Sequence, residues 1–216
     1  RMIMFGLYLA KDIPFSTVYL HSMVTDEKGQ KMSKSKGNVI NPIDIANEFG
    51  ADSLRIALVA GCAPGNPIAL SKEKVKGYRN FGNKLWNVGR FIIMLKEQGI
   101  DVAQAGKPAG EDEMLLRKTS ALVVKITKDL EKYRFSDAAL STYDFVWNTL
   151  ANEYLESTKN REDKATVMST LLQSFVPCLK LLHPFMPFVT EAIWQAFKHE
   201  NLVQESLLMT APWPDK

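Results

Sequence analysis

Apolar residues recur at helical spacing along most of the chain after residue 70. Within residues 72–96 they are separated by four, three, four and three positions, the spacing of one face of an amphipathic helix. This pattern predicts a long helix that turns its apolar face toward a core. The positions on that face are Phe81, Leu85, Val88, Ile92 and Leu95.

The same spacing predicts two helices after a Gly- and Ala-rich connection over residues 97–112. One has its apolar positions between Leu115 and Tyr133. The other is expected to begin at Ser136, a residue suited to an N-cap, and to carry apolar positions through Tyr154.

Two further helices complete the pattern near the end of the sequence. Residues 166–184 are apolar on several sides, which predicts a central helix, and Pro177 within it is expected to cause a kink. A shorter helix is predicted over residues 187–199. We therefore expect residues 71–216 to form an antiparallel helical bundle.

The first seventy residues have a mixed pattern. β-Branched and aromatic residues in "STVYLH" (16–21) predict a short buried strand. Residues 62–70, "CAPGNPIAL", contain two prolines and one glycine and are expected to form a loop at a domain boundary. The fold class predicted is mainly α, with an incomplete α/β unit before the bundle.

Two short helices are expected between that strand and that loop. Asn41 is suited to be an N-cap with Pro42 in the first helical position, and this helix is expected to end near Gly50. A second helix is expected over residues 51–61, with Asp52 available to cap it.

Composition adds few constraints. The 216 residues are 46% hydrophobic and 24% charged, which is ordinary for a globular domain, and the net charge is only +3. Cys62 and Cys178 are far apart and are expected to be buried thiols rather than metal ligands or a disulfide. No apolar run approaches the ~20 residues of a membrane span, and a cytoplasmic location is expected. The chain begins on Arg1 rather than Met, so we expect it to be a piece of a longer protein.

Positive charge is concentrated in "DEKGQKMSKSKGNVINP" (26–42). Lys31, Lys34 and Lys36 lie between Gly29 and Gly37, two residues that allow tight turns. Lysine is a compact charge on a long flexible stem and is suited to phosphate oxygens. Composition leaves two interpretations open: an ordinary solvated loop, or a mobile clamp on a polyphosphate.

The order of residues in this loop resembles a known family. "KMSKS" (31–35), followed by Gly-Asn and then Pro42, resembles the signature loop of class I aminoacyl-tRNA synthetases, and "GADSLR" (50–55) also matches that family. The resemblance implies a remnant of a Rossmann-type nucleotide-binding fold, with ATP and Mg²⁺ as cofactors of the full-length enzyme. It makes Lys31 and Lys34 catalytic and implies a five-residue ATP-binding loop of Lys31, Met32, Ser33, Lys34 and Ser35.

"GYRNFGNKLWNVGRF" (77–91) closely resembles the entry to the anticodon-binding domain of valyl-tRNA synthetases. The resemblance implies ATP-dependent joining of valine to tRNA(Val) through valyl-adenylate. An isoleucyl or leucyl enzyme and a free-standing tRNA-binding module are the alternatives, and no obligate protein partner is indicated. The implied domains are residues 1–38 of the catalytic fold, a stem-contact connection over 39–70, and the bundle. The chain contains no HIGH-type histidine motif, so by itself it is expected to be inactive.

A polar face lies opposite the apolar face of the helix predicted at 72–96. The segment has seven basic residues and one acid, Glu73. Such a face is either solvated or suited to RNA, with cations for phosphates and amides for base edges. The resemblance favours tRNA contact, with Trp86 as a candidate stacking surface. The candidate tRNA-binding residues are Lys76, Arg79, Asn83, Trp86, Asn87 and Arg90.

Overall fold

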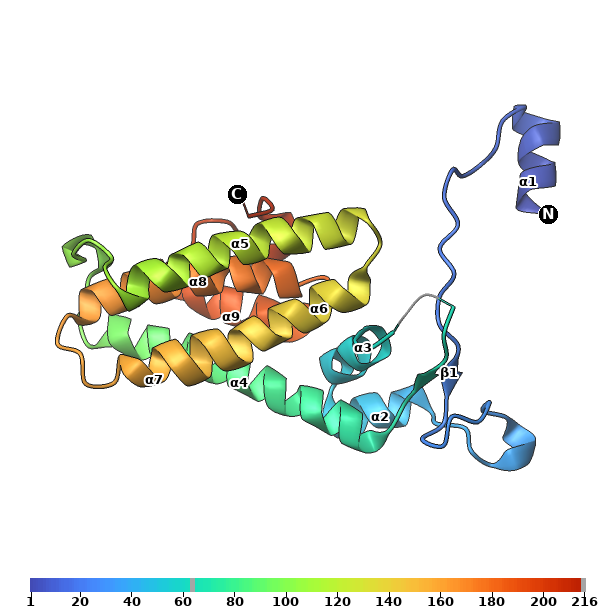
Figure 1. The fold of residues 1–216 in the computed structure, drawn as a ribbon, viewed down its shortest axis with the longest axis horizontal. Coiled ribbons are helices and arrows are strands. Elements are labelled where there is room, and N and C mark those ends of the chain that lie inside the picture. Colours follow the sequence, from blue (N-terminus) through green and yellow to red (C-terminus); the bar gives the residue numbers. More distant parts are fainter. Residues whose placement is uncertain (63–64, 215–216) are drawn as a thin grey trace.

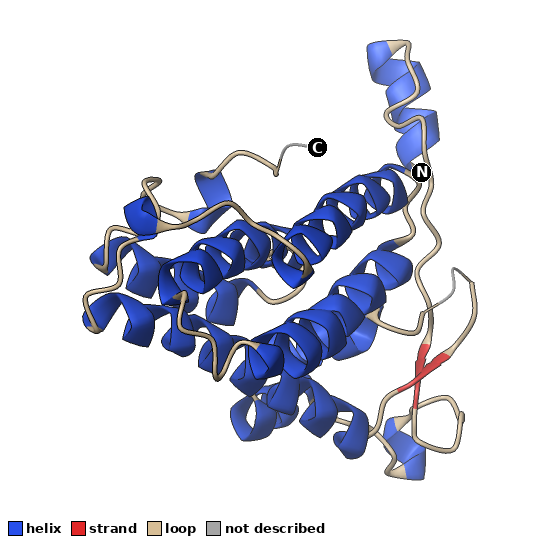
Figure 2. Ribbon diagram, turned by 60° about the vertical axis from the view of Figure 1, so that its left-hand side comes forward, coloured by secondary structure: helices blue, strands red, loops and turns tan. Residues whose placement is uncertain are grey.

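The computed structural model describes residues 1–62 and 65–214, and within them it consists of helices beside one small pair of strands (Figures 1 and 2). The fold is mainly α, as predicted. The first part of the chain contains α1 (Met2–Phe5), the π-helical turn η1 (Gly6–Ala10), β1 (Val24–Thr25), the 3₁₀ turn η2 (Lys34–Lys36), α2 (Pro42–Phe49), α3 (Ala51–Val59) and β2 (Ile68–Ala69).

The second part is an antiparallel bundle, also as predicted (Figure 1). Short 3₁₀ turns η3 (Val102–Gln104) and η5 (Leu208–Thr210) lie in its connections. Its helical elements are α4 (Lys72–Glu97), α5 (Glu111–Glu131), α6 (Phe135–Asp144), the π-helical stretch η4 (Phe145–Tyr154), α7 (Leu155–Ser157), α8 (Lys164–Leu182) and α9 (Pro187–His199).

The long helix α4 agrees with the sequence pattern. Its five apolar positions are all 3% exposed or less, and Ser71 caps its N-terminus by accepting from the N–H of Lys74. Gly89 lies against α9, where a Cβ atom at this position would be only 2.9 Å from Cγ2 of Ile193. The glycine therefore permits the two helices to approach closely.

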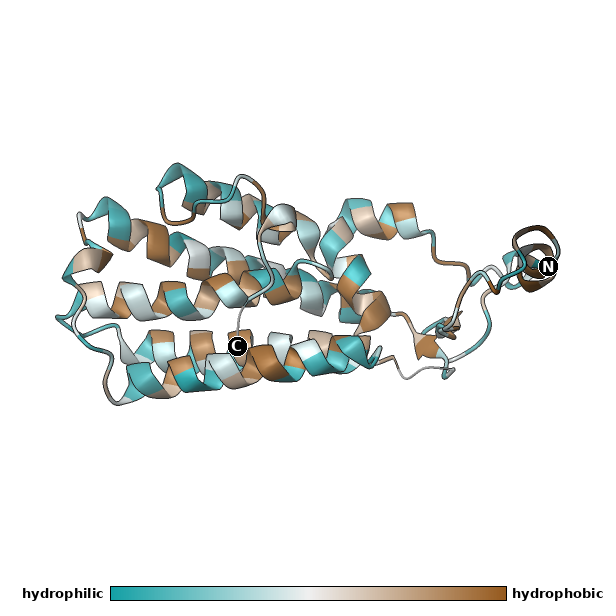
Figure 3. Cartoon of the chain, turned by 90° about the horizontal axis from the view of Figure 1, so that it is seen from above, coloured by the Kyte–Doolittle hydropathy of each residue, from teal (hydrophilic) through white to brown (hydrophobic). Residues whose placement is uncertain are grey.

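Helix α8 is central, as its apolar composition predicted. It contacts α4, α5, α6 and α9, and eleven of its residues are buried. In the part of the chain that the structure describes, it is the one helix with the length and mean hydropathy of a membrane span, contrary to our expectation that no segment approaches that length. Because 61% of that apolar window is buried inside the bundle, its composition is explained by a core position. Hydropathy colouring shows hydrophobic and hydrophilic positions mixed along the helices of the bundle (Figure 3).

Two predictions about the middle helices were wrong, and one feature of them was not predicted. Helix α5 ends at Glu131, and Tyr133 lies beyond it in the left-handed conformation with 46% of its surface exposed. Ser136 lies inside α6 and does not cap it; its Oγ accepts instead from the N–H of Gly61, at 2.9 Å. Local spacing did not predict the π-helical stretch η4, which continues α6 for ten residues with a wider helical turn.

The strand predicted at residues 16–21 is absent, because this segment pairs with no backbone in the described part of the chain. Val18 and Leu20 are each 68% exposed. The strand is instead β1, which pairs in parallel with β2 (Val24 with Ile68, Thr25 with Ala69). Residues 68–69 were expected to be loop, so the pairing corrects that prediction as well.

A second, smaller core lies beneath this pair of strands. Its buried residues come from α2, α3, α4 and the position directly after β2, and Met32 of the lysine-rich loop packs against them. Asn41 caps α2 and Gly50 ends it, as predicted. The buried residues are Ile45, Leu54, Ala57, Leu70 and Val75.

We had expected Asp52 to cap its own helix, but it does not. Its carboxylate reaches α9 and accepts from the backbone N–H groups of Phe188 (3.2 Å) and Val189 (2.6 Å). One turn further along α3, Arg55 Nη2 donates to the carbonyl oxygen of Pro184, at 3.0 Å. The "GADSLR" segment thus joins the second core to the turn between α8 and α9.

The two cysteines differ. Cys178 is fully buried, as predicted, and burial raises the pKa of its thiol well above the ordinary range. Cys62 is only half-buried, contrary to prediction, because it lies at the end of α3 where the chain leaves the core; its Sγ donates to the carbonyl oxygen of Leu58.

Candidate functional site

The lysine-rich loop begins with a tight hairpin. Thr25 and Lys31 face each other in an antiparallel bridge, and Gly29 at the tip has φ +75°, a conformation that glycine adopts without strain. Asp26 organises the turn, because its Oδ1 accepts from the N–H groups of Lys28 and Gln30. The hairpin therefore directs the chain back toward the motif lysines.

Asn38 closes the base of the loop. Its amide donates to Oδ2 of Asp26 at 2.8 Å and to the carbonyl oxygen of Lys31, and its Oδ1 accepts from the N–H of Ser33. The hydrogen bond from Asn38 and those from the hairpin backbone hold the pKa of the Asp26 carboxyl below its ordinary value. Hydrogen bonds between these side chains and the backbone thus fix both ends of the lysine segment.

The motif lysines extend into solvent from this frame. Lys34 begins the 3₁₀ turn η2, and Gly37 ends that turn with φ +66°. Lys31, Lys34 and Lys36 are exposed, and no carboxylate of the described residues lies within ion-pair distance of them. Three ammonium groups without a counter-ion on one short loop are suited to a polyanion.

The remaining motif residues have different surroundings. The side chain of Met32 packs on the second core and anchors the loop. Ser33 and Ser35 lie with their hydroxyl oxygens 3.2 Å apart. The predicted ATP-binding roles of Met32, Ser33 and Ser35 remain predictions.

Helix α4 carries the second candidate set. Three of its seven basic residues are already engaged: Lys72 pairs with Glu48 at 2.7 Å, Lys74 donates to the carbonyl oxygen of Ala60, and Lys84 donates to Asn152. Burial lowers the pKa of Lys74. These three contacts belong to the fold.

The predicted tRNA-binding positions are the ones left available. All six are exposed, and within residues 1–62 and 65–214 their side chains form no hydrogen bond or ion pair. Lys76 and Arg90 are 14 residues apart, so the face extends about 21 Å along the helix. The structure therefore presents cations, amides and one indole ring along a single surface.

Part of this face borders a groove of about 560 Å³ between α4 and the start of α9. Arg79, Asn83 and Trp86 line its α4 side, and Phe188, which is 65% exposed, lines the side of α9. The sequence pattern did not identify Phe188 as a surface residue, since it lies within an apolar segment. Its position at the first turn of α9 exposes it.

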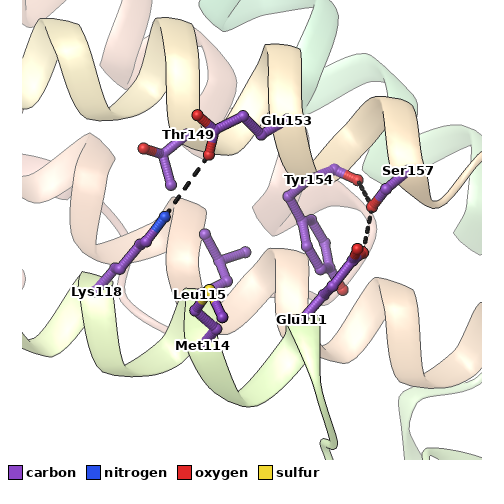
Figure 4. A pocket seen from close by; sticks show the side chains of 8 residues that line it. All are labelled: Glu111, Met114, Leu115, Lys118, Thr149, Glu153, Tyr154 and Ser157. Atoms are coloured by element: carbon purple, nitrogen blue, oxygen red, sulfur yellow. Dashed lines mark hydrogen bonds and ion pairs between the residues drawn. The ribbon is translucent and has the colours of Figure 1, made fainter.

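A smaller cavity of about 150 Å³ lies between the start of α5 and η4 (Figure 4). Lys118 pairs with Glu153 at 3.7 Å across one side, and Ser157 donates to Glu111 at 2.6 Å on the other. None of the predicted site residues lines this cavity, and its charged side chains are paired with other residues of the lining. It is a feature of the bundle rather than of the candidate site.

Two family models match the chain on either side of α4. Residues 1–71 match the model of class I tRNA synthetases (I, L, M and V), and residues 112–216 match the anticodon-binding domain of tRNA ligase. The chain belongs to the class I aminoacyl-tRNA synthetases. The lysine-rich loop thus falls in the synthetase match, and α5 through α9 fall almost wholly in the anticodon-binding match.

Among curated proteins, this synthetase chain is similar to valine–tRNA ligases. It is 42% identical to the enzyme of Rhodopseudomonas palustris over 225 residues, and 42% identical to that of Bradyrhizobium diazoefficiens over 228 residues. It is 38% identical to the enzyme of Petrotoga mobilis over 229 residues. All of this chain is covered in each comparison, but only 23 to 25% of each relative. The chain therefore spans about a quarter of the length of the curated relatives it matches.

Solved structures have the same fold as this synthetase chain. The ternary LeuRS-tRNA-LeuAMS complex of Agrobacterium radiobacter matches 99% of this chain and 26% of that chain, with a TM-score of 0.75 and 24% identity. Mycobacterium tuberculosis methionyl-tRNA synthetase in complex with methionyl-adenylate matches 81% of this chain and 36% of that chain, with a TM-score of 0.68 and 24% identity.

Proposed function

We propose that this chain is the part of a valine–tRNA ligase that carries the ATP-phosphate loop and the tRNA-binding bundle. The observation that carries the proposal is the set of three unpaired lysines on a loop fixed by Asp26 and Asn38, next to a helix with an exposed basic face. Similarity to valine–tRNA ligases over the whole chain supports valine as the amino acid.

In the intact enzyme, attack on the α-phosphate of ATP would leave negative charge on the departing pyrophosphate. Lys34 stabilises that charge as it develops, and Lys31 assists. A cation that binds more tightly in the transition state than in the ground state lowers the barrier. The loop is suited to this role in charge stabilisation, because its ends are held by hydrogen bonds while its lysine side chains remain unpaired.

ATP, valine and tRNA(Val) are the proposed substrates. Magnesium, when bound, would neutralise part of the charge on the nucleotide phosphates. The described residues contain no cluster of three or more His, Cys, Asp or Glu side chains placed to hold a metal. We therefore assign no metal ligand to this chain and expect Mg²⁺ to be held by the phosphates and by other parts of the enzyme.

The proposal is tested by aminoacylation with the full-length protein. Purified enzyme is supplied with ATP, Mg²⁺, the tRNA pool of its source, and valine, isoleucine or leucine in separate reactions. Charging of tRNA(Val) with valine at a kcat/KM at least 100-fold above that for the other two amino acids is expected. Preferential charging with isoleucine or leucine would assign the chain to that enzyme instead, and no charging with any of the three would overturn the synthetase assignment.

A further inference from the structure

The groove between α4 and α9 brings together two aromatic side chains from distant parts of the sequence. Trp86 on α4 is 43% exposed, and Phe188 on the first turn of α9 is 65% exposed. Single exposed apolar residues are ordinary, but apolar side chains that gather at one groove mark an interaction site. In this chain they border the same groove.

The charged side chain available to a ligand in the groove is positive. Two charged residues line it, Asp52 and Arg79. Asp52 is 8% exposed, and both of its carboxylate oxygens already accept hydrogen bonds from the start of α9. Arg79 is exposed and has no partner among the described residues, so the groove offers one available cation and no available anion.

The polar group next to this cation is an amide. Asn83 lies one helical turn beyond Arg79, and its side chain forms no hydrogen bond to the part of the chain that the structure describes. An amide both donates and accepts, as recognition of a base edge requires. The groove is also continuous with the basic face of α4, which includes Lys76 and Arg90.

From these observations we propose that the groove receives one unpaired nucleotide of the bound tRNA. The base stacks against Trp86 and Phe188, its edge meets Asn83, and its phosphate meets Arg79. The volume of about 560 Å³ is in the range of pockets that take small ligands. A base inside a duplex is already stacked, so only an unpaired nucleotide fits this role. The inference rests on the proposed function, since it assumes tRNA as the partner.

The first test measures tRNA(Val) affinity of the full-length enzyme with Phe188 replaced. Phe188→Ala is expected to weaken binding by roughly 5- to 100-fold, from the usual contribution of a base–aromatic stack. Phe188→Trp keeps a stacking surface and is expected to bind as the unmodified enzyme does. Phe188→Leu keeps apolar area without a ring and is expected to behave more like Phe188→Ala. The salt dependence of binding is expected to be the same for all four proteins, because no phosphate contact is removed.

A control variant is Leu207→Ala, which truncates an exposed apolar side chain outside the groove and is expected to leave affinity unchanged. If Phe188→Ala binds tRNA as tightly as the unmodified enzyme, the groove assignment is wrong. Equal binding by Phe188→Leu and the unmodified enzyme would likewise exclude stacking.

The second test places p-benzoylphenylalanine at position 188 and identifies what it crosslinks under light. A crosslink to one unpaired tRNA nucleotide is expected. Crosslinking to a stem nucleotide, to protein only, or to no RNA would overturn the assignment. Failure of the proposed function is distinguishable: the unmodified enzyme would then neither charge nor bind tRNA. Normal charging, together with unchanged tRNA affinity in Phe188→Ala and no RNA crosslink at position 188, would refute this inference alone.

Discussion

Asp52 Oδ2 accepts a hydrogen bond from the backbone N–H of Val189 at 2.6 Å, although the two residues are 137 positions apart. Because the same carboxylate also binds the N–H of Phe188, it satisfies two of the N–H groups that the first turn of a helix leaves unpaired. The cap of α9 is therefore supplied by another helix, α3.

Removal of this cap is expected to destabilise the fold. Asp52→Ala should lower the free energy of unfolding by about 1–2 kcal/mol, the usual cost of losing an N-cap, as measured by urea titration. Asp44→Ala is the matched control, since that exposed aspartate lies in the first turn of α2 without a capping hydrogen bond, and a loss below about 0.5 kcal/mol is expected. Equal losses in the two variants would show that the contact from α3 to α9 contributes nothing special.

Lys34 is expected to act in catalysis rather than in substrate binding. In the full-length enzyme, Lys34→Ala should slow ATP–pyrophosphate exchange roughly 100- to 1000-fold, the usual effect of removing one donor to a developing charge, with little change in the KM for valine. Lys28→Ala, at the exposed tip of the hairpin, is the control and should cost less than tenfold. An unchanged exchange rate in Lys34→Ala would contradict the assigned role.

The exposed cations of α4 are expected to bind RNA phosphates. Arg79→Gln combined with Arg90→Gln should reduce tRNA affinity and lower the slope of log K against log salt by about 2, because each lost phosphate contact releases about one fewer counterion. Lys128→Gln removes an exposed charge from α5 and should leave the slope unchanged. Should the double variant keep both its affinity and its slope, this face of α4 is merely solvated.

Replacing Gly82 or Gly89 of α4 by alanine is expected to change the stability of the chain in opposite directions. At Gly89 the added Cβ would lie 2.9 Å from Ile193, so Gly89→Ala should destabilise the chain by about 1–3 kcal/mol through overpacking. At Gly82 the nearest atom, of Met186, is 3.6 Å away, and Gly82→Ala should be neutral or stabilise by up to about 1 kcal/mol. Thermal unfolding of both variants checks the contrast, which fails if their shifts have the same sign and size.

Asp112 is expected to make stability depend on pH below about 4. Burial raises the pKa of its carboxyl, but hydrogen bonds from Arg161 and Tyr154 outweigh this and hold that pKa below its ordinary value. Since the folded-state pKa lies below the unfolded value of about 3.9, the stabilisation is complete above that pH and is lost as pH falls through the folded pKa.

The measurement is urea unfolding of the unmodified chain and of Asp112→Asn between pH 7 and pH 2.5. At pH 7 the variant should be less stable by about 1–3 kcal/mol, because Arg161 loses its buried partner but keeps its ion pair with Asp163. This difference should shrink as the pH falls below 4. A difference that stays constant down to pH 2.5 would show that the pKa of this carboxyl is not lowered in the folded chain.

The sequence alone predicted the helices of the bundle well, because each carries its own apolar face. The five buried positions of α4 follow from spacing within a single helix, as do the bounds of α9. The lysine-rich loop and the exposed face of α4 were also identified from residue type and order. Their roles in catalysis and tRNA binding remain predictions.

Features that depend on a distant partner were missed. Asp52 and Ser136 both resemble local N-caps, yet each accepts a hydrogen bond from another element, and one sequence window does not show which N–H group lies nearby. The strand predicted at 16–21 failed for the same reason, since a strand needs a second backbone. Phe188 was missed because exposure at the start of α9 depends on what packs around it.

The length of helix α4 determines how far its two ends move when the helix tilts. Its 26 residues form an uninterrupted rod about 39 Å long, which begins at the small core beneath the lysine-rich loop and ends at the opposite extremity of the molecule (Figure 1). A stiff rod of this length acts as a lever: a tilt of about 5° at one extremity displaces the other by about 3 Å. A rigid tilt of α4 at the far side of the bundle would therefore move the small core on which the lysine-rich loop is anchored, without any residue in between changing its conformation.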